Sequence, residues 1–319
     1  MTRRTRPFRS ILVPLDGSLF AEQALPWALA IGRAARSKVR LVRVHQSAAL
    51  PISVEAARYF NSMDQAVRRS ERKYLREVAG RLRRSGGPGI SSALLAGPVT
   101  DTLTQYVHDS RADLVVMTTH GRGPLQRVWL GSVADHLIRH LQVPVLLIRP
   151  RERPLTAKRP PAIKRMMVPL DGSSLAEAAL TPAAALARLL DIEVVLLEVV
   201  APLLVNIPPM GPPSIGFYEQ GLKLVQSEAE EYLQAIAKRL DQEGLAATSR
   251  VVLGPEAAGT ILEVARHSRV GLVTIATRGQ GGIRRLALGS VADKVVRGAE
   301  IPVLVIRPAK ISSKTLARR

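Results

Sequence analysis

Five short apolar runs alternate with longer amphipathic stretches in the first half of the chain, and this alternation predicts its secondary structure. Short runs rich in β-branched residues are typical of buried strands, whereas apolar positions three or four apart are typical of helices with one buried face. The stretch 62–85 shows the helical spacing at Val67, Tyr74, Leu75, Val78 and Leu82. We expect strands at about 10–15, 39–45, 90–96, 113–118 and 144–149, and helices near 19–36, 62–85, 99–109 and 131–141.

The second half of the chain repeats the first. The block that ends in Asp16-Gly-Ser returns 155 residues later with Asp171, and two further blocks return 158 residues later. A polar, proline-rich segment separates the copies. We therefore predict a first domain over 1–150, a linker over 151–163, a second domain over 164–309 and a basic tail over 310–319. Strands of the second copy are expected near 165–170, 192–199, 247–253, 271–276 and 302–307.

The order of the expected elements predicts the fold class. Short buried strands that alternate with helices form right-handed β-α-β units, in which a mostly parallel sheet is covered on both faces. Five strands in each copy suit a doubly wound sheet. We therefore expect an α/β protein that consists of two tandem, doubly wound, parallel five-stranded sheets.

A glycine and a serine open the fourth expected helix in both copies, as Gly131-Ser132 and as Gly289-Ser290. Asp135 follows Ser132 by three positions, which is the spacing of a capping box. The start of a helix presents unpaired N–H groups and the positive end of the dipole, and both favour an anion such as phosphate. Gly121, at the end of the fourth strand, would let the backbone approach a ligand closely.

Asp16 and Asp171 follow the first strand of each copy. Open α/β sheets bind ligands at the carboxyl ends of their strands, where a carboxylate can accept hydrogen bonds from ribose hydroxyls. Alternatively, Asp-Gly-Ser is only a strand-to-helix turn, and Gly-Ser is only a helix cap. Because both motifs occur at the same expected rim, and occur twice, we favour a nucleotide-binding interpretation.

These residues resemble the universal stress protein family in its tandem form, over nearly the whole of both domains. The nucleotide signature of that family is Gly-x2-Gly-x9-Gly-[Ser/Thr]. The second glycine, third glycine and serine of the signature match here at Gly121, Gly131, Ser132, Gly279, Gly289 and Ser290. The first glycine is replaced by Thr118 in one copy and by Ala276 in the other.

The resemblance implies an adenine nucleotide alpha-hydrolase-like fold with strand order 3-2-1-4-5 and an ATP site in each domain, with Mg²⁺ held through the phosphates. It implies that Thr118 and Ala276 lie at the ribose. It also assigns three further roles: nucleoside contact to Pro14, Asp16, Pro169 and Asp171, adenine contact to Val44 and Val199, and phosphate-binding N–H groups to Val133 and Val291. Pairing of the two domains through their fifth strands, as a pseudo-dimer, and a possible homodimer are further implications.

The chain has a net charge of +20, most of which lies outside the two copies. Residues 10–148 carry +8, residues 166–306 carry −3, and the arm, linker and tail carry the remaining +15. We interpret these basic segments as solvated, so nucleic acid is not the expected partner, although the charge alone leaves it open. No apolar run has the roughly 20 residues of a membrane span, and no secretory signal is evident, so we expect a cytoplasmic protein without a membrane partner.

Catalysis is not predicted. No acid-base constellation recurs in both copies, and no Walker A motif is present. His136 and His140 stand four residues apart, but the second copy has Lys294 and Gly298 there, so we expect no metal site. His120 is matched by Arg278, which suits contact with phosphate better than proton transfer. The favoured function is a nucleotide-dependent switch; a scaffold with degenerate sites, a slow ATPase and an autophosphorylating protein remain alternatives.

Overall fold

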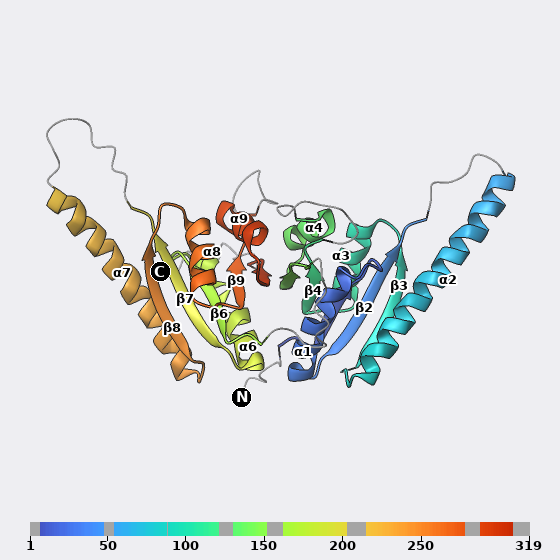
Figure 1. The fold of residues 1–319 in the computed structure, drawn as a ribbon, viewed down its shortest axis with the longest axis horizontal. Coiled ribbons are helices and arrows are strands. Elements are labelled where there is room, and N and C mark those ends of the chain that lie inside the picture. Colours follow the sequence, from blue (N-terminus) through green and yellow to red (C-terminus); the bar gives the residue numbers. More distant parts are fainter. Residues whose placement is uncertain are drawn as a thin grey trace, which may run out of the picture. The chain divides into compact units, whose positions relative to one another are not determined.

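The computed structural model describes residues 7–47, 54–87, 89–120, 130–151, 162–202, 215–277 and 288–308. The chain divides into two compact units, residues 1–161 and 162–319 (Figure 1). None of the helices in these described segments is both long enough and apolar enough to cross a membrane.

The elements of the first unit alternate as the sequence predicts. They are β1 (Ser10–Pro14), η1 (Ala21–Ala24), α1 (Leu25–Ala35), β2 (Lys38–His45), α2 (Val54–Arg84), β3 (Ile90–Ala96), α3 (Val99–Asp109), β4 (Leu114–Thr118), α4 (Ser132–His140) and β5 (Val145–Ile148).

The second unit repeats this order. Its elements are β6 (Arg165–Leu170), α5 (Ser174–Glu177), α6 (Leu180–Leu190), β7 (Glu193–Val200), α7 (Ile215–Gln242), β8 (Ala247–Leu253), α8 (Ala257–His267), β9 (Leu272–Ala276), α9 (Ser290–Gly298) and β10 (Val303–Ile306).

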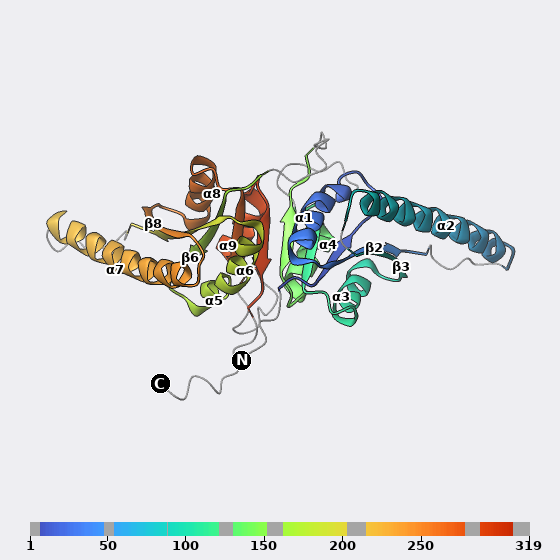
Figure 2. The ribbon, with the colours of Figure 1, turned by 90° about the horizontal axis from the view of Figure 1, so that it is seen from below.

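In its described residues, each unit contains five parallel strands. The order in the first is β3-β2-β1-β4-β5, and the second has the same order, β8-β7-β6-β9-β10. In the first unit, α1 and α2 lie on one side of the sheet, and α3 lies on the other (Figure 2). This is the doubly wound α/β arrangement that the sequence predicts.

The central strands are buried on both faces, which explains their continuous apolar sequences. Ile11, Leu12 and Val13 in β1 are completely inaccessible to solvent, as are Met166, Met167 and Val168 in β6. Each Å² of apolar surface that is buried stabilises the fold by about 25 cal/mol, so these strands contribute strongly to stability.

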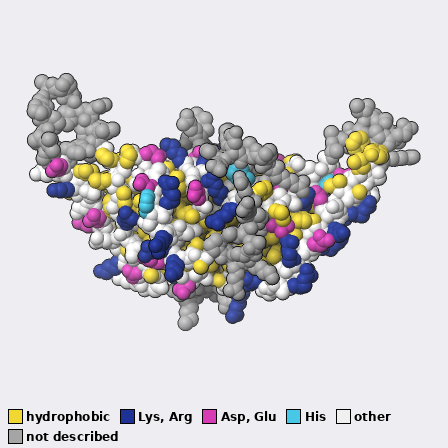
Figure 3. Space-filling view, in the orientation of Figure 1, with side chains coloured by type: hydrophobic (Ala, Val, Ile, Leu, Met, Phe, Trp, Pro, Cys, Tyr) yellow, Lys and Arg dark blue, Asp and Glu magenta, His cyan; other side chains and the backbone are white. Residues whose placement is uncertain are grey.

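Two expected helices differ from the observed ones. The helix expected at 19–36 is a 3-10 turn followed by α1, whose first turn contains Pro26. Proline is tolerated in a first turn but not in a helix interior, so the α-helix begins beside it. The helix expected at 62–85 begins at Val54. The outer part of α2 carries exposed apolar side chains, at Tyr59, Phe60, Met63 and Val67 (Figure 3).

Candidate functional site

A cavity of about 460 Å³ lies at the carboxyl ends of the strands in the first unit. Here β1 pairs with both β2 and β4. The helices that lead from β1 to β3 cross one face of the sheet, and the helix that leads back to β4 crosses the other (Figure 2). This is the switch point at which doubly wound sheets bind ligands. The cavity is lined by every expected site residue of this unit that the structure describes: Pro14, Asp16, Val44, Thr118, Gly131, Ser132 and Val133. Gly121 lies outside the described residues.

The second unit has a smaller cavity, of about 150 Å³, in the corresponding place. It too is lined by all the described site residues expected for its unit: Pro169, Asp171, Val199, Ala276, Gly289, Ser290 and Val291. Gly279 and Arg278 lie outside the described residues. Residues that are far apart in the sequence are therefore brought together in each unit separately.

The start of α4 lies against the end of β4. The N–H of Gly131 donates to the carbonyl oxygen of Thr119 at 2.8 Å. A Cβ atom at residue 131 would lie only 2.9 Å from that same oxygen, so the close approach requires glycine. The glycine therefore fixes where the first N–H groups of α4 point.

The capping box expected at Ser132 and Asp135 is wrong. Gly131 is the N-cap residue, no side chain caps it, and Ser132 is already the first residue of the helix. Asp135 instead accepts two hydrogen bonds from Arg139 one turn further on, at 2.8 and 2.9 Å. Gly289 is likewise an N-cap without a side-chain cap, and Asp293 pairs with Arg297. Neither N-cap glycine has a side-chain cap, and the acidic residue in the first turn of each helix, Asp135 or Asp293, pairs with an arginine.

Asp16 forms the strand-to-helix turn, and it also lines the cavity. Its Oδ1 accepts hydrogen bonds from the N–H and the hydroxyl of Ser18, at 2.9 and 2.6 Å. Asp171 makes the same contacts with Ser173, at 3.0 and 2.5 Å. The two interpretations are thus compatible, because the local turn holds the carboxylate at the rim.

Thr118 and His120 close one wall of the first cavity. The Thr118 hydroxyl donates to the carbonyl oxygen of His120 at 2.8 Å, so this branched side chain is held within the turn after β4. The Nδ1 atom of His120 lies 2.9 Å from the Thr119 hydroxyl, whereas its Nε2 is buried and has no hydrogen-bond partner in the described part of the chain. Burial, and then the charge of Arg149, lowers the pKa of His120. The neutral ring offers a ligand a hydrogen bond and no charge.

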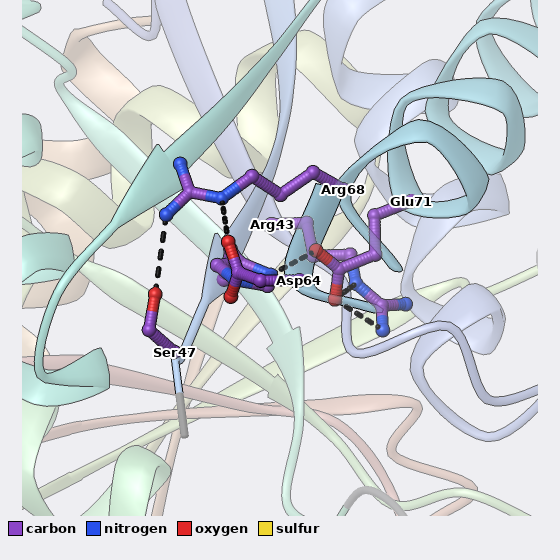
Figure 4. A network of polar contacts seen from close by, with 6 residues as sticks. Arg43, Ser47, Asp64, Arg68 and Glu71 are labelled. Carbon is purple, nitrogen blue, oxygen red and sulfur yellow. Dashed lines mark hydrogen bonds and ion pairs between the residues drawn. The ribbon is translucent and has the colours of Figure 1, made fainter. Parts of the chain in front are cut away.

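A polar network beside this cavity was missed in the sequence (Figure 4). His45, at the end of β2, is almost completely buried, and its ring lies between two carboxylates. Its Nδ1 is 2.8 Å from Glu71 Oε2, and its Nε2 is 2.7 Å from Asp64 Oδ1. Glu71 also binds Arg43, at 2.9 and 3.0 Å, and Asp64 binds Arg68 at 2.6 Å.

The network places charged side chains at the rim of the cavity, because Arg43 and Glu71 both line it. The His45 ring lies between two carboxylates, each of which also binds an arginine: Glu71 binds Arg43, and Asp64 binds Arg68. A sequence signal existed, since Asp64, Arg68 and Glu71 continue the stripe of Leu75, Val78 and Leu82 with polar residues.

The network predicts a dependence of stability on pH. Hydrogen bonds from His45 and then from Arg68 hold the pKa of Asp64 at about 2, below its ordinary value of 3.8. A lowered pKa stabilises the folded state above the ordinary value, and that contribution is lost as the pH falls from about 4 toward 2. At about pH 6 we expect the wild type to unfold at a higher urea concentration than Asp64→Asn. At about pH 3 the difference between their urea midpoints should be smaller.

The exposed Asp109, at the end of α3, offers a control, since Asp109→Asn should shift the midpoint little at either pH. A difference between wild type and Asp64→Asn that is equally large at both pH values would contradict this assignment.

No group of three or more histidine or acidic side chains is placed to hold a metal in the described part of the chain. The His136 and His140 rings stack with their centroids 3.9 Å apart, and Nδ1 of His140 lies 2.8 Å from the carbonyl oxygen of His136. These two histidines therefore contact each other and their own helix.

Comparisons with known proteins agree with this architecture. The model of the universal stress protein family matches residues 7–149 and, separately, residues 162–307. A universal stress protein of Methanocaldococcus jannaschii is 31% identical over 148 residues, which cover 46% of this chain and 84% of that protein. One from Mycolicibacterium smegmatis is 27% identical over 302 residues, covering 93% of this chain and 97% of that protein.

The crystal structure of a universal stress protein from Archaeoglobus fulgidus has the same fold. It superposes with a TM-score of 0.65 at 17% identity and covers 94% of this chain and 97% of that one. With two family matches that together span most of its length, this chain belongs to the universal stress protein family and contains the family's domain twice.

Proposed function

We propose that this universal stress protein binds an adenine nucleotide, ATP, and acts as a nucleotide-dependent switch in the stress response rather than as a metabolic enzyme. One observation carries the proposal: a single cavity joins a carboxylate after β1, an apolar wall at the end of β2 and the uncapped start of α4. Its volume of about 460 Å³ lies within the range of small-molecule sites.

Each part of the cavity suits one part of the ligand. The N–H groups of Ser132 and Val133, in the first turn of α4, would donate to phosphate. Asp16 would accept from ribose hydroxyls, and Val44 would pack against the base. The unpaired Nε2 of His120 would gain a hydrogen-bond partner. Mg²⁺ would be held by the phosphates, which supply the oxygen ligands that it prefers.

We also propose that the two units form an intrachain pseudo-dimer through β5 and β10. Each strand is the last in the order of its own unit, and its four residues are all apolar. An apolar strand at a sheet edge promotes aggregation unless it is covered. Pairing of these strands would cover both.

Isothermal titration of the full chain with ATP and Mg²⁺ tests the nucleotide part. We expect saturable heat with micromolar affinity, which Ser132→Glu removes, because a carboxylate at the helix start would compete with phosphate. With the protein present, ATP should be hydrolysed to ADP no faster than in a protein-free control. Absence of heat with the wild type would rule out nucleotide binding, and steady ADP release would favour a slow ATPase.

A further inference from the structure

The two units differ in charge at one equivalent position beside the cavity. Arg43 in β2 follows Val42, which pairs with Pro14, and Glu198 in β7 follows Leu197, which pairs with Pro169. The register is the same in both sheets, so an arginine in the first unit is replaced by a glutamate in the second. A cation and an anion thus take the same place relative to the first-strand aspartate.

The network that holds Arg43 is also confined to the first unit. The long helices align at Tyr74 and Tyr232, and their buried stripes coincide, with Leu75, Val78 and Leu82 matching Leu233, Ile236 and Leu240. In this alignment Glu71 becomes Ala229, Asp64 becomes Leu222 and Arg68 becomes Gln226. His45 becomes Val200 by the strand register. No member of the network keeps its charge.

Glu198 therefore lacks the partners that Arg43 has. Its Oε2 is buried and has no hydrogen-bond partner among the residues that the structure describes. The nearby hydroxyl of Tyr232 donates instead to Glu177, at 3.1 Å. Burial, followed by the charge of Asp171, raises the pKa of Glu198. Asp171 lines the second cavity, and Glu198 stands between the lining residues Leu197 and Val199 without lining it, so two carboxylates repel each other near this site.

The two cavities also differ in size, and this difference, like the difference in charge, favours a ligand in the first unit. The second has about 150 Å³ against about 460 Å³ in the first, and only the larger lies within the range of small-molecule sites. The net charge agrees, since residues 10–148 carry +8 and residues 166–306 carry −3. Size, local charge and regional charge all favour a polyanion in the first unit and oppose one in the second.

We propose that the two sites are not equivalent: the first unit binds the nucleotide, the second excludes it, and the Arg43/Glu198 position determines this choice. The chain then binds one nucleotide per molecule. This inference rests on the nucleotide binding proposed above. The second unit keeps the fold and the glycine-serine helix start, but not the charge or the volume that a polyphosphate requires.

Counting bound nucleotide in the full chain tests the stoichiometry. Native mass spectrometry with ATP and Mg²⁺ should show one nucleotide per chain at saturation. The matched variants Ser132→Glu and Ser290→Glu place a carboxylate in the first turn of α4 and α9, where it favours the helix. We expect Ser132→Glu to lower ATP affinity at least tenfold and Ser290→Glu to leave one nucleotide bound.

The role of charge is tested at Arg43. Arg43→Gln should weaken the binding of ATP several-fold more than the binding of adenosine, which has no phosphate. Arg43→Lys should retain most of the ATP affinity. Circular dichroism establishes that each variant is folded. An ATP affinity equal to wild type in folded Arg43→Gln would overturn the role of this position.

The possible results separate the two proposals. If the wild type binds no nucleotide, the proposed function fails and the inference fails with it. If two nucleotides bind, and each serine variant removes one, nucleotide binding stands while the non-equivalence of the sites is refuted.

Discussion

Replacing Glu71 with alanine is expected to lower the free energy of unfolding by about 3 to 5 kcal/mol, the cost of breaking a buried ion pair by removing one partner. The Glu71 carboxylate joins Arg43, at 2.9 Å, to His45, at 2.8 Å, and its side chain is only 10% exposed. Without it, the Arg43 guanidinium and the His45 ring both lose a buried carboxylate partner between β2 and α2. Urea denaturation at neutral pH measures the effect.

Glu77 provides the control for this prediction. It lies on the same helix and pairs with Lys73 at 4.0 Å, but its side chain is 64% exposed. Glu77→Ala should therefore change the free energy of unfolding by less than about 1 kcal/mol. If Glu71→Ala costs no more than Glu77→Ala, the network does not stabilise the first unit.

The second large effect is expected at Gly131. In Gly131→Ala, the new Cβ would lie 2.9 Å from the carbonyl oxygen of Thr119, so β4 and the start of α4 must separate. Because the N–H groups of Ser132 and Val133 move with the helix, we expect ATP affinity to fall by about tenfold or more. Titration calorimetry measures the loss.

A matched glycine on α2 distinguishes this effect from a general effect of alanine. A Cβ at Gly80 would meet only the flexible end of Arg84, at 3.5 Å. Gly80→Ala should preserve ATP affinity and raise stability by roughly 0.5 to 1 kcal/mol, because glycine is a poor helix former. Equal ATP affinities in both alanine variants would show that the helix start does not contact the ligand.

The fold was predictable because the central strands contain continuous apolar runs, such as Ile11-Leu12-Val13 in β1. The expected strand at 90–96 is β3 (Ile90–Ala96), and the one at 165–170 is β6 (Arg165–Leu170). Apolar runs in the central strands are recognisable without tertiary information, since these strands are buried on both faces. The start of α2 was less predictable, because Tyr59 and Phe60 are exposed and continue no buried stripe.

The site was predictable where glycine and strand ends define it, and unpredictable where side chains from distant segments meet. Gly131, Ser132 and Asp16 line one cavity, as their positions after β4 and β1 suggested. The contact of His45 with Asp64 and Glu71 depends on how α2 packs over β2, which no local pattern encodes. The capping box failed for a related reason, because its spacing does not show which residue is the N-cap.

The ends of β2 and β7 are positions at which a duplicated gene can change the charge beside its site, provided that the contacting residues change with it, as Glu71 and Ala229 do. Arg43 and Glu198 belong neither to the apolar interior nor to the helix start, and both are only partly buried. Substitution there alters the electrostatic character of a site while the strands that carry it remain intact. Under the proposal made here, gene duplication followed by change at such a position leaves one polypeptide with one site that accepts a polyanion and one that opposes it.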